Sequence, residues 1–157
     1  MSIEHLCCES NSPYTLGMAK RVFDVWFDGA CGPVNPGGTA AFGYAVYEDG
    51  DKVTEGYGVI GRGPLMSNNV AEYCGVIEAA KCIMTMAPGA IVRFHGDSNL
   101  VVQQLSGKWK AKQGLYIPYL LEARRLCAEL NASFHWIPRE QNAEADALSK
   151  KPLAPGN

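Results

Sequence analysis

Apolar and polar residues recur along the chain with two periods, which divide it into strands and helices. Five stretches have the β-branched and aromatic content typical of strands: residues 22–29, 42–47, 53–60, 91–96 and 133–137. Residues 69–86 repeat apolar side chains at a helical period, and shorter helices are expected over residues 99–105, 115–130 and 142–150. The predicted element order is therefore β-β-β-α-β-α-α-β-α.

Turn residues separate these segments and indicate how they connect. Asp49-Gly50 lies between the second and third strands, and an Asp-Gly pair in this position favours a tight hairpin. Pro88-Gly89 ends the long helix, and Pro118 falls near the start of another, where proline is tolerated. Strands joined by short turns pair antiparallel, whereas strands reached through helices pair in parallel. The pattern predicts an α/β fold with one mixed five-stranded sheet, three antiparallel strands and then parallel strands, flanked by helices.

Length and composition limit the class of protein. A chain of 157 residues with 47% hydrophobic and 19% charged residues fits one globular domain. We expect a flexible extension over residues 1–20, the folded domain over residues 21–150 and a tail over residues 151–157. No apolar run approaches the roughly 20 residues of a membrane span, and the first residues lack a secretion signal, so a cytoplasmic location is expected.

Net charge and cysteine content indicate which kinds of binding and which metal or disulfide sites are unfavourable for this chain. The formal charge of −2 argues against a polycation that coats nucleic acid, although it leaves room for a local basic surface. The six cysteines include no Cys-x-x-Cys pair, which disfavours a structural zinc site. Without a secretion signal, the thiols are expected to stay reduced.

Four acidic residues stand near the ends of predicted elements. Asp28, followed by Gly29, is expected to end the first strand, and Asp97 follows the fourth strand. Because neighbouring strands lie about 5 Å apart, two adjacent strands that both end in Asp would hold their carboxylates side by side. Glu72 is expected in the first turn of the long helix, and Asp146 near the start of the last helix.

Spacing alone leaves two interpretations of these acids open. Acids at strand and helix ends are commonly solvated caps. Clustered carboxylates, by contrast, repel one another and raise each other's pKa values unless they hold divalent cations. Oxygen ligands suit Mg²⁺ or Mn²⁺, and two such ions about 4 Å apart clamp the attacking and leaving oxygens of an in-line phosphoryl displacement. Two Mg²⁺ would change the formal charge from −2 to +2, which favours binding of a polyanion.

The acids lie in four longer segments with a recognisable pattern. These are Phe27-Asp28-Gly29-Ala30-Cys31 with Asn35-Pro36-Gly37-Gly38, Ser67-Asn68-Asn69-Val70-Ala71-Glu72-Tyr73, Asp97-Ser98-Asn99-Leu100-Val101-Val102 and Asn142-Ala143-Glu144-Ala145-Asp146-Ala147-Leu148-Ser149. Together they resemble the four signature segments of type 1 ribonuclease H, in the family's order and at compatible spacing. The resemblance covers residues 21–150 and implies the ribonuclease H-like fold, which agrees with the predicted element order.

This resemblance implies an endoribonuclease that hydrolyses the RNA strand of RNA–DNA hybrids and leaves 5′-phosphate and 3′-hydroxyl ends. It implies two Mg²⁺ ions, with Mn²⁺ as a substitute, held by Asp28, Glu72, Asp97 and Asp146. The expected partner is a hybrid duplex. The protein is expected to be a monomer that needs neither a membrane nor an obligate protein partner. A catalytically silent hybrid-binding domain, or a related nuclease acting on double-stranded RNA, stays open as an alternative.

Residues near the acids resemble the family's substrate contacts. Four asparagines match contacts to sugars and minor-groove edges: Asn35, Asn68, Asn69 and Asn99. Ser67 resembles a hydroxyl residue that helps fix a DNA-strand phosphate. Asparagine side chains suit such contacts because an amide both donates and accepts hydrogen bonds. Capping of a turn or a helix is the alternative role. Trp109, among three lysines, is expected either to grip the DNA strand by charge and stacking or to close the core.

One loop departs from the family pattern. Many members carry a histidine in a glycine-rich loop before the last Asp, whereas here Arg139-Glu140-Gln141 leads straight to Asn142. The general-acid or product-release role given to that histidine is therefore vacant, and Arg139 or Glu140 is a candidate substitute. Asn142 is expected to cap the last helix. His95 and His135 are expected to pack and hydrogen-bond rather than to catalyse.

Overall fold

The structure is a computed structural model that describes residues 20–154. Its strands are β1 (Val22–Gly32), β2 (Thr39–Glu48), β3 (Asp51–Arg62), β4 (Ile91–Gly96) and β5 (Asn131–Trp136). Its α-helices are α3 (Asn68–Met86), α4 (Asn99–Leu105), α5 (Ile117–Cys127) and α6 (Ala143–Lys150). Two short 3₁₀ helices, η1 (Arg139–Gln141) and η2 (Lys151–Leu153), flank α6.

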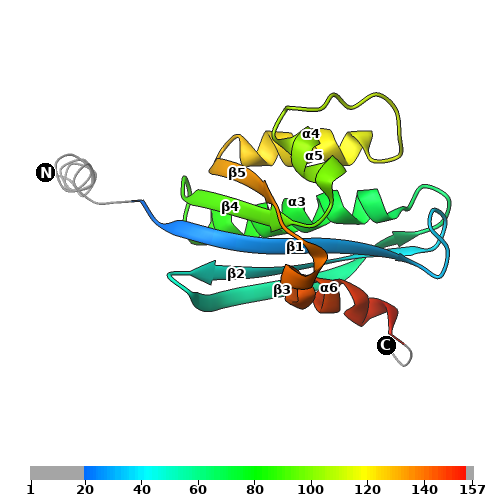
Figure 1. Cartoon of the computed structure of the whole chain (residues 1–157), viewed down its shortest axis with the longest axis horizontal. Helices are drawn as coiled ribbons and strands as arrows, with labels where there is room; N and C mark the ends of the chain where they lie inside the picture. The colour runs from blue at the N-terminus through cyan, green and yellow to red at the C-terminus, as the bar shows by residue number, and fades with distance from the viewer. Residues whose placement is uncertain (1–19, 155–157) are drawn as a thin grey trace, which may run out of the picture.

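A single mixed sheet has the strand order β3-β2-β1-β4-β5 (Figure 1). β1 runs antiparallel to β2 and parallel to β4, while β3 and β5 extend the antiparallel and parallel halves. The loop between β2 and β3 consists of Asp49 and Gly50, whose φ values of 53° and 82° are those of a tight hairpin. The predicted fold class is confirmed.

Alternation along β1 divides its side chains between the two faces of the sheet. Phe23, Val25 and Phe27 are fully buried in the core that β1 forms with α3 and α5. On the other face, α6 packs against β1 and β2. The two acid-bearing helices, α3 and α6, therefore approach β1 from opposite sides near the position of Asp28.

Asp28 lies inside β1, so the expectation that it ends the strand is wrong. The parallel pairing with β4 stops at Trp26 and His95, but the antiparallel pairing with β2 continues to Gly32. The strand persists on its β2 side after its β4 side has become free. Asp28 therefore marks the end of one ladder rather than the end of the strand.

Two further boundaries differ from the prediction. Glu72 falls in the second turn of α3, because the helix begins at Asn68. Residues 151–153 form η2 rather than a loose tail, and the Leu153 side chain lies near Gly32 of β1. Residues 1–19 of the extension predicted over residues 1–20 lie outside the described residues, as do the last three residues, 155–157. Within residues 20–154, no helix combines the length and the apolar content needed to cross a membrane.

Candidate active site

Asp28 and Asp97 come together because β1 and β4 are parallel neighbours in register. Trp26 pairs with His95 at the last position of the ladder, and each acid follows two residues later along its own chain segment. β4 ends at Gly96, and Ser98 immediately caps α4 by accepting a hydrogen bond from the backbone N of Val101. Asp97 is thereby fixed in the sharp turn between strand and helix.

Glu72 reaches the same place because α3 crosses very close to β1. Ser67 begins the helix, since its Oγ accepts from the backbone N of Val70 at 3.2 Å. Gly29 allows the crossing: a Cβ at this position would overlap the backbone of Ala71 and Glu72. The Asp-Gly pair thus supplies one carboxylate and the space for the helix that carries the next.

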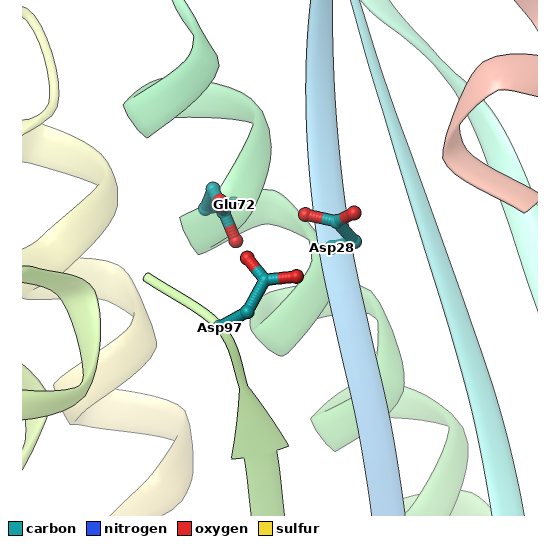
Figure 2. A group of neighbouring side chains, drawn as sticks. All are labelled: Asp28, Glu72 and Asp97. Atoms are coloured by element: carbon teal, nitrogen blue, oxygen red, sulfur yellow. The ribbon is translucent and has the colours of Figure 1, made fainter. Parts of the chain in front are cut away.

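Asp28, Glu72 and Asp97 form a compact acidic group (Figure 2). One carboxylate oxygen from each lies within 4.8 Å of the other two. Asp28 and Glu72 are only 5% and 7% exposed, whereas Asp97 is half-buried. Glu72 Oε1 is buried without a hydrogen-bond partner among the described residues. The three acids therefore converge as the sequence predicted, and one buried oxygen is left unsatisfied.

Asp146 lines the same cavity but is not one of the three acids whose oxygens converge. A cavity of about 270 Å³ is lined by all four acids, together with Gly29, Ala30, Cys31, Asn68, Arg139 and Lys150. Asp146 is in the first turn of α6, as expected, and its Oδ2 accepts from Lys150 Nζ at 3.1 Å. The sequence analysis did not identify Lys150 as a site residue. Its position four residues after Asp146 could have indicated it, because oppositely charged residues at i and i+4 of a helix commonly pair.

Burial and mutual repulsion disfavour the charged forms of Asp28 and Glu72. Burial raises the pKa of Asp28 to about 7, with further contributions from Asp97 and Asp146, while the backbone N–H of Gly29 acts in the opposite direction. Burial, Asp28 and Asp97 raise the pKa of Glu72 well above its ordinary value, and Arg139 opposes them. A divalent cation would relieve this repulsion and satisfy Glu72 Oε1. The all-oxygen donor set fits Mg²⁺ or Mn²⁺.

The candidate substrate-binding asparagines lie at different distances from the acids. Asn68 lines the cavity, and its backbone N donates to Oδ1 of Asn35 at 2.9 Å, which brings Asn35 beside it. Asn69 is half-buried in the first turn of α3. Asn99 is exposed at the start of α4, where its Oδ1 accepts from Gln103 at 3.1 Å. Of these four, only Asn68 is among the residues that line the acidic cavity.

Trp109 does not close the core. It is 46% exposed in the segment between α4 and α5, and its backbone N, like that of Lys108, donates to the carbonyl of Gln103. Lys108, Lys110 and Lys112 are also exposed. This segment therefore presents an aromatic face flanked by three positive charges.

The loop before α6 contributes one charged and one buried residue to the site. Arg139 lines the cavity, whereas Glu140 is exposed and is not among the lining residues. Asn142 occupies the N-cap position, but its side chain makes no capping hydrogen bond. Instead its Nδ2 donates to the Phe27 carbonyl at 3.0 Å and to Asp97 Oδ2 at 3.1 Å. The expectation of a side-chain cap is wrong because these contacts hold the amide.

The two described histidines pack on the sheet, as expected. His95 Nε2 lies 2.9 Å from Asp24 Oδ1, and the His95 ring stacks between Trp26 and His135, with centroid distances of 4.6 and 5.4 Å. His135 also hydrogen-bonds Ser133 at 2.8 Å. Neither histidine is among the residues that line the acidic cavity.

Comparisons with known proteins agree with this fold. A family model described as reverse transcriptase-like matches residues 27–152, which include all four acids. Bifunctional protein Rv2228c of Mycobacterium tuberculosis is 35% identical over 119 residues, which cover 73% of this chain and 31% of that protein. Ribonuclease HI of Halobacterium salinarum is 37% identical over 133 residues, which cover 82% of this chain and 62% of that protein.

The fold is also similar to those of solved ribonuclease H1 structures. The crystal structure of RNase H1 from Halobacterium salinarum matches with a TM-score of 0.75 and 32% identity, over 84% of this chain and 97% of that one. LC11-RNase H1, solved in complex with an RNA/DNA hybrid, matches with a TM-score of 0.73 and 27% identity, over 84% and 99% of the two chains. The fold and site thus define a reverse transcriptase-like domain. Within that class, the chain belongs to the type 1 ribonuclease H family of hydrolases, and it spans about a third of the mycobacterial relative.

Proposed function

We propose that this domain is an endonuclease that hydrolyses the RNA strand of RNA–DNA hybrids. The observation that carries the proposal is the convergence of Asp28, Glu72 and Asp97 within 4.8 Å, with Asp146 lining the same cavity. The relatives named ribonuclease H support it, and LC11-RNase H1 was solved with a hybrid bound. Cleavage would leave 5′-phosphate and 3′-hydroxyl ends.

Two divalent cations, Mg²⁺ or Mn²⁺, are the proposed cofactors. Asp28 would hold both, because its carboxylate belongs to the group with Glu72 and Asp97 and lines the same cavity as Asp146. Glu72 and Asp97 would hold the ion beside the attacking water, and Asp146 the ion beside the leaving 3′-oxygen. When bound, the pair supplies Lewis-acid stabilisation of the attacking and leaving oxygens.

Hybrid recognition is proposed to depend on shape and on 2′-hydroxyl groups rather than on base sequence. Asn68 is positioned for this task because it lines the acidic cavity, with Asn35 hydrogen-bonded to it. Exposed Trp109 and its flanking lysines would bind the DNA strand. Arg139 is the proposed partial substitute for the loop histidine, since it lines the cavity and Glu140 does not.

Cleavage assays on defined duplexes test the proposal. Labelled RNA–DNA hybrid, duplex RNA and duplex DNA are each incubated with the wild-type protein and Mg²⁺ or Mn²⁺, and the product ends are mapped. We expect cleavage of the hybrid's RNA strand, and a loss of at least about 100-fold in Asp28→Asn, because removing a group that stabilises the transition state by a few kcal/mol has this effect. Asp49→Asn, the same change in the β2–β3 hairpin, is the matched control.

The assay also separates the alternatives. Hybrid binding without cleavage by the wild-type protein would indicate a silent binding domain. Comparable cleavage of duplex RNA would indicate a nuclease of broader specificity. The monomeric state, the domain limits at residues 21 and 150 and the cytoplasmic location remain predictions from the sequence.

A further inference from the structure

Asn142 makes a buried polar connection between α6 and the acidic group. Its side chain is 1% exposed. The Nδ2 atom donates to the carbonyl of Phe27, the residue before Asp28, and to Oδ2 of Asp97. Its backbone carbonyl accepts from the backbone N of Asp146 at 3.0 Å. One residue therefore contacts the segments that carry three of the four acids.

Chemistry fixes the orientation of this amide. A backbone carbonyl and a carboxylate only accept hydrogen bonds, so the NH₂ end must face both of them, and both of its protons are used. The other end, Oδ1, is buried without a partner among the described residues. An unsatisfied buried acceptor lowers stability. Asn142 therefore directs two hydrogen-bond donors at the segments of the acidic group, while its unsatisfied Oδ1 lowers the stability of the folded state.

One of these donors acts directly on the carboxylate of Asp97. Asp97 lies in the short connection between β4 and α4, beyond the last pair of the β1–β4 ladder, and its backbone carbonyl accepts from Trp136 Nε1 at 3.1 Å. Asn142 anchors Asp97 Oδ2, and Figure 2 shows the Asp97 carboxylate turned toward Asp28 and Glu72. Without the amide, the Asp97 side chain is free to rotate away from the other two acids.

We propose that Asn142 is a positioning residue for the cation site, which orients Asp97 and aligns α6 with β1 so that the carboxylates are preassembled. This inference rests on the proposed function, because it assigns the acids to cation binding. Partners that orient metal-ligating groups typically change metal affinity or activity by about 10–100-fold when removed. Asn142 contacts Asp97 and would not itself touch the ions.

Substitution by alanine is a usable test because space for water lies next to Asn142. A second cavity of about 310 Å³ borders it on the side of Trp26 and Tyr47. Water entering there would solvate the Phe27 carbonyl in Asn142→Ala, so the variant is expected to fold. Circular dichroism and urea unfolding check this directly.

Calorimetric titration with Mn²⁺, without nucleic acid, measures the effect. We expect Asn142→Ala to lose about 10–100-fold in Mn²⁺ affinity while keeping the wild-type circular dichroism spectrum. Gln104→Ala is the matched control. Gln104 is also 1% exposed and hydrogen-bonds Tyr73 and Tyr116, and it is not among the residues that line the acidic cavity. It should lose stability and keep its Mn²⁺ affinity. Unchanged Mn²⁺ affinity in Asn142→Ala, or an equal loss in Gln104→Ala, would overturn the proposal.

A double-mutant cycle identifies the route of the effect. In an Asp97→Asn background, adding Asn142→Ala should cause little further loss of Mn²⁺ affinity, because the carboxylate that it orients is already gone. Fully additive losses would contradict a role through Asp97. If Asn142→Ala does not fold, Asn142→Ser carries the same cycle, since serine is a favourable residue at a helix N-cap position but is too short to bridge both acceptors. Because no substrate is present, a wild-type protein that binds Mn²⁺ but does not cleave hybrid refutes the proposed function alone.

Discussion

At the scale of single residues, the site combines burial with repulsion. Asp28 and Glu72 are almost fully enclosed, and each faces other carboxylates. Such an arrangement opposes folding unless a proton or a cation neutralises it. Glu72 Oε1, buried without a partner within the described part of the chain, indicates where a compensating cation would bind.

The raised pKa of Asp28 predicts a pH-dependent stability in metal-free buffer. The folded protein keeps the Asp28 proton up to a pKa of about 7, whereas the unfolded chain releases it near 3.8. Between these values the unfolded state binds fewer protons, so the free energy of unfolding falls as pH rises, by roughly 1.4 kcal/mol per unit of pKa difference. Urea unfolding from pH 4 to pH 8 should show a smaller fall in Asp28→Asn. Identical slopes in the two proteins would contradict the assignment.

At the scale of elements, two glycines admit the acid-bearing helices. Asp28 pairs with Gly43 of β2, and a Cβ on Gly43 would overlap α6 at Ser149. Gly29 has the same relation to α3. Both helices therefore approach the strand pair where the first carboxylate is located. The sequence indicated Asp28-Gly29 as the end of the first strand, because local pattern does not show that a glycine makes room for a distant helix.

Replacing Gly29 tests this close approach. Gly29→Ala should lower the free energy of unfolding by about 1–3 kcal/mol, the usual cost of overpacking, and weaken Mn²⁺ binding because α3 must move away from β1. Gly61→Ala is the control, since its new Cβ would meet only the flexible Met66 side chain. Urea unfolding and Mn²⁺ titration measure the two effects. A variant as stable as Gly61→Ala would refute the close-approach argument.

The segment between α4 and α5 has its own test. Exchanging Lys108, Lys110 and Lys112 for alanine should weaken hybrid binding and reduce the slope of log K against log salt by about 0.9 for each phosphate that the variant no longer neutralises. Lys81→Ala, which removes an exposed lysine paired with Glu78 on α3, should leave the slope unchanged. Fluorescence anisotropy over a salt series gives both values. An unchanged slope in the triple variant would exclude phosphate binding by this segment.

At the scale of the whole molecule, cation binding links charge to stability. The chain carries a formal charge of −2, and two Mg²⁺ would bring it to +2. A ligand that binds only the folded state adds about 2.7 kcal/mol per site at a hundredfold excess over its Kd. Mg²⁺ should therefore raise the Tm of the wild-type protein and of Asp49→Asn, and raise that of Asp28→Asn much less. Equal shifts in all three would place the cations elsewhere.

Local pattern determined much of this protein. Periodicity predicted every strand and α-helix now seen in residues 20–154, and the Asp49-Gly50 pair predicted the hairpin, because these features depend on neighbours in sequence. The resemblance of four segments selected the acids. Tertiary structure decided how these residues meet. The Asn142 side chain hydrogen-bonds a backbone carbonyl 115 positions away in the sequence. Asp28 lies in the part of β1 that pairs only with β2, and Trp109 is exposed. Such contacts depend on strand order and on the packing of helices against the sheet, which no local pattern encodes.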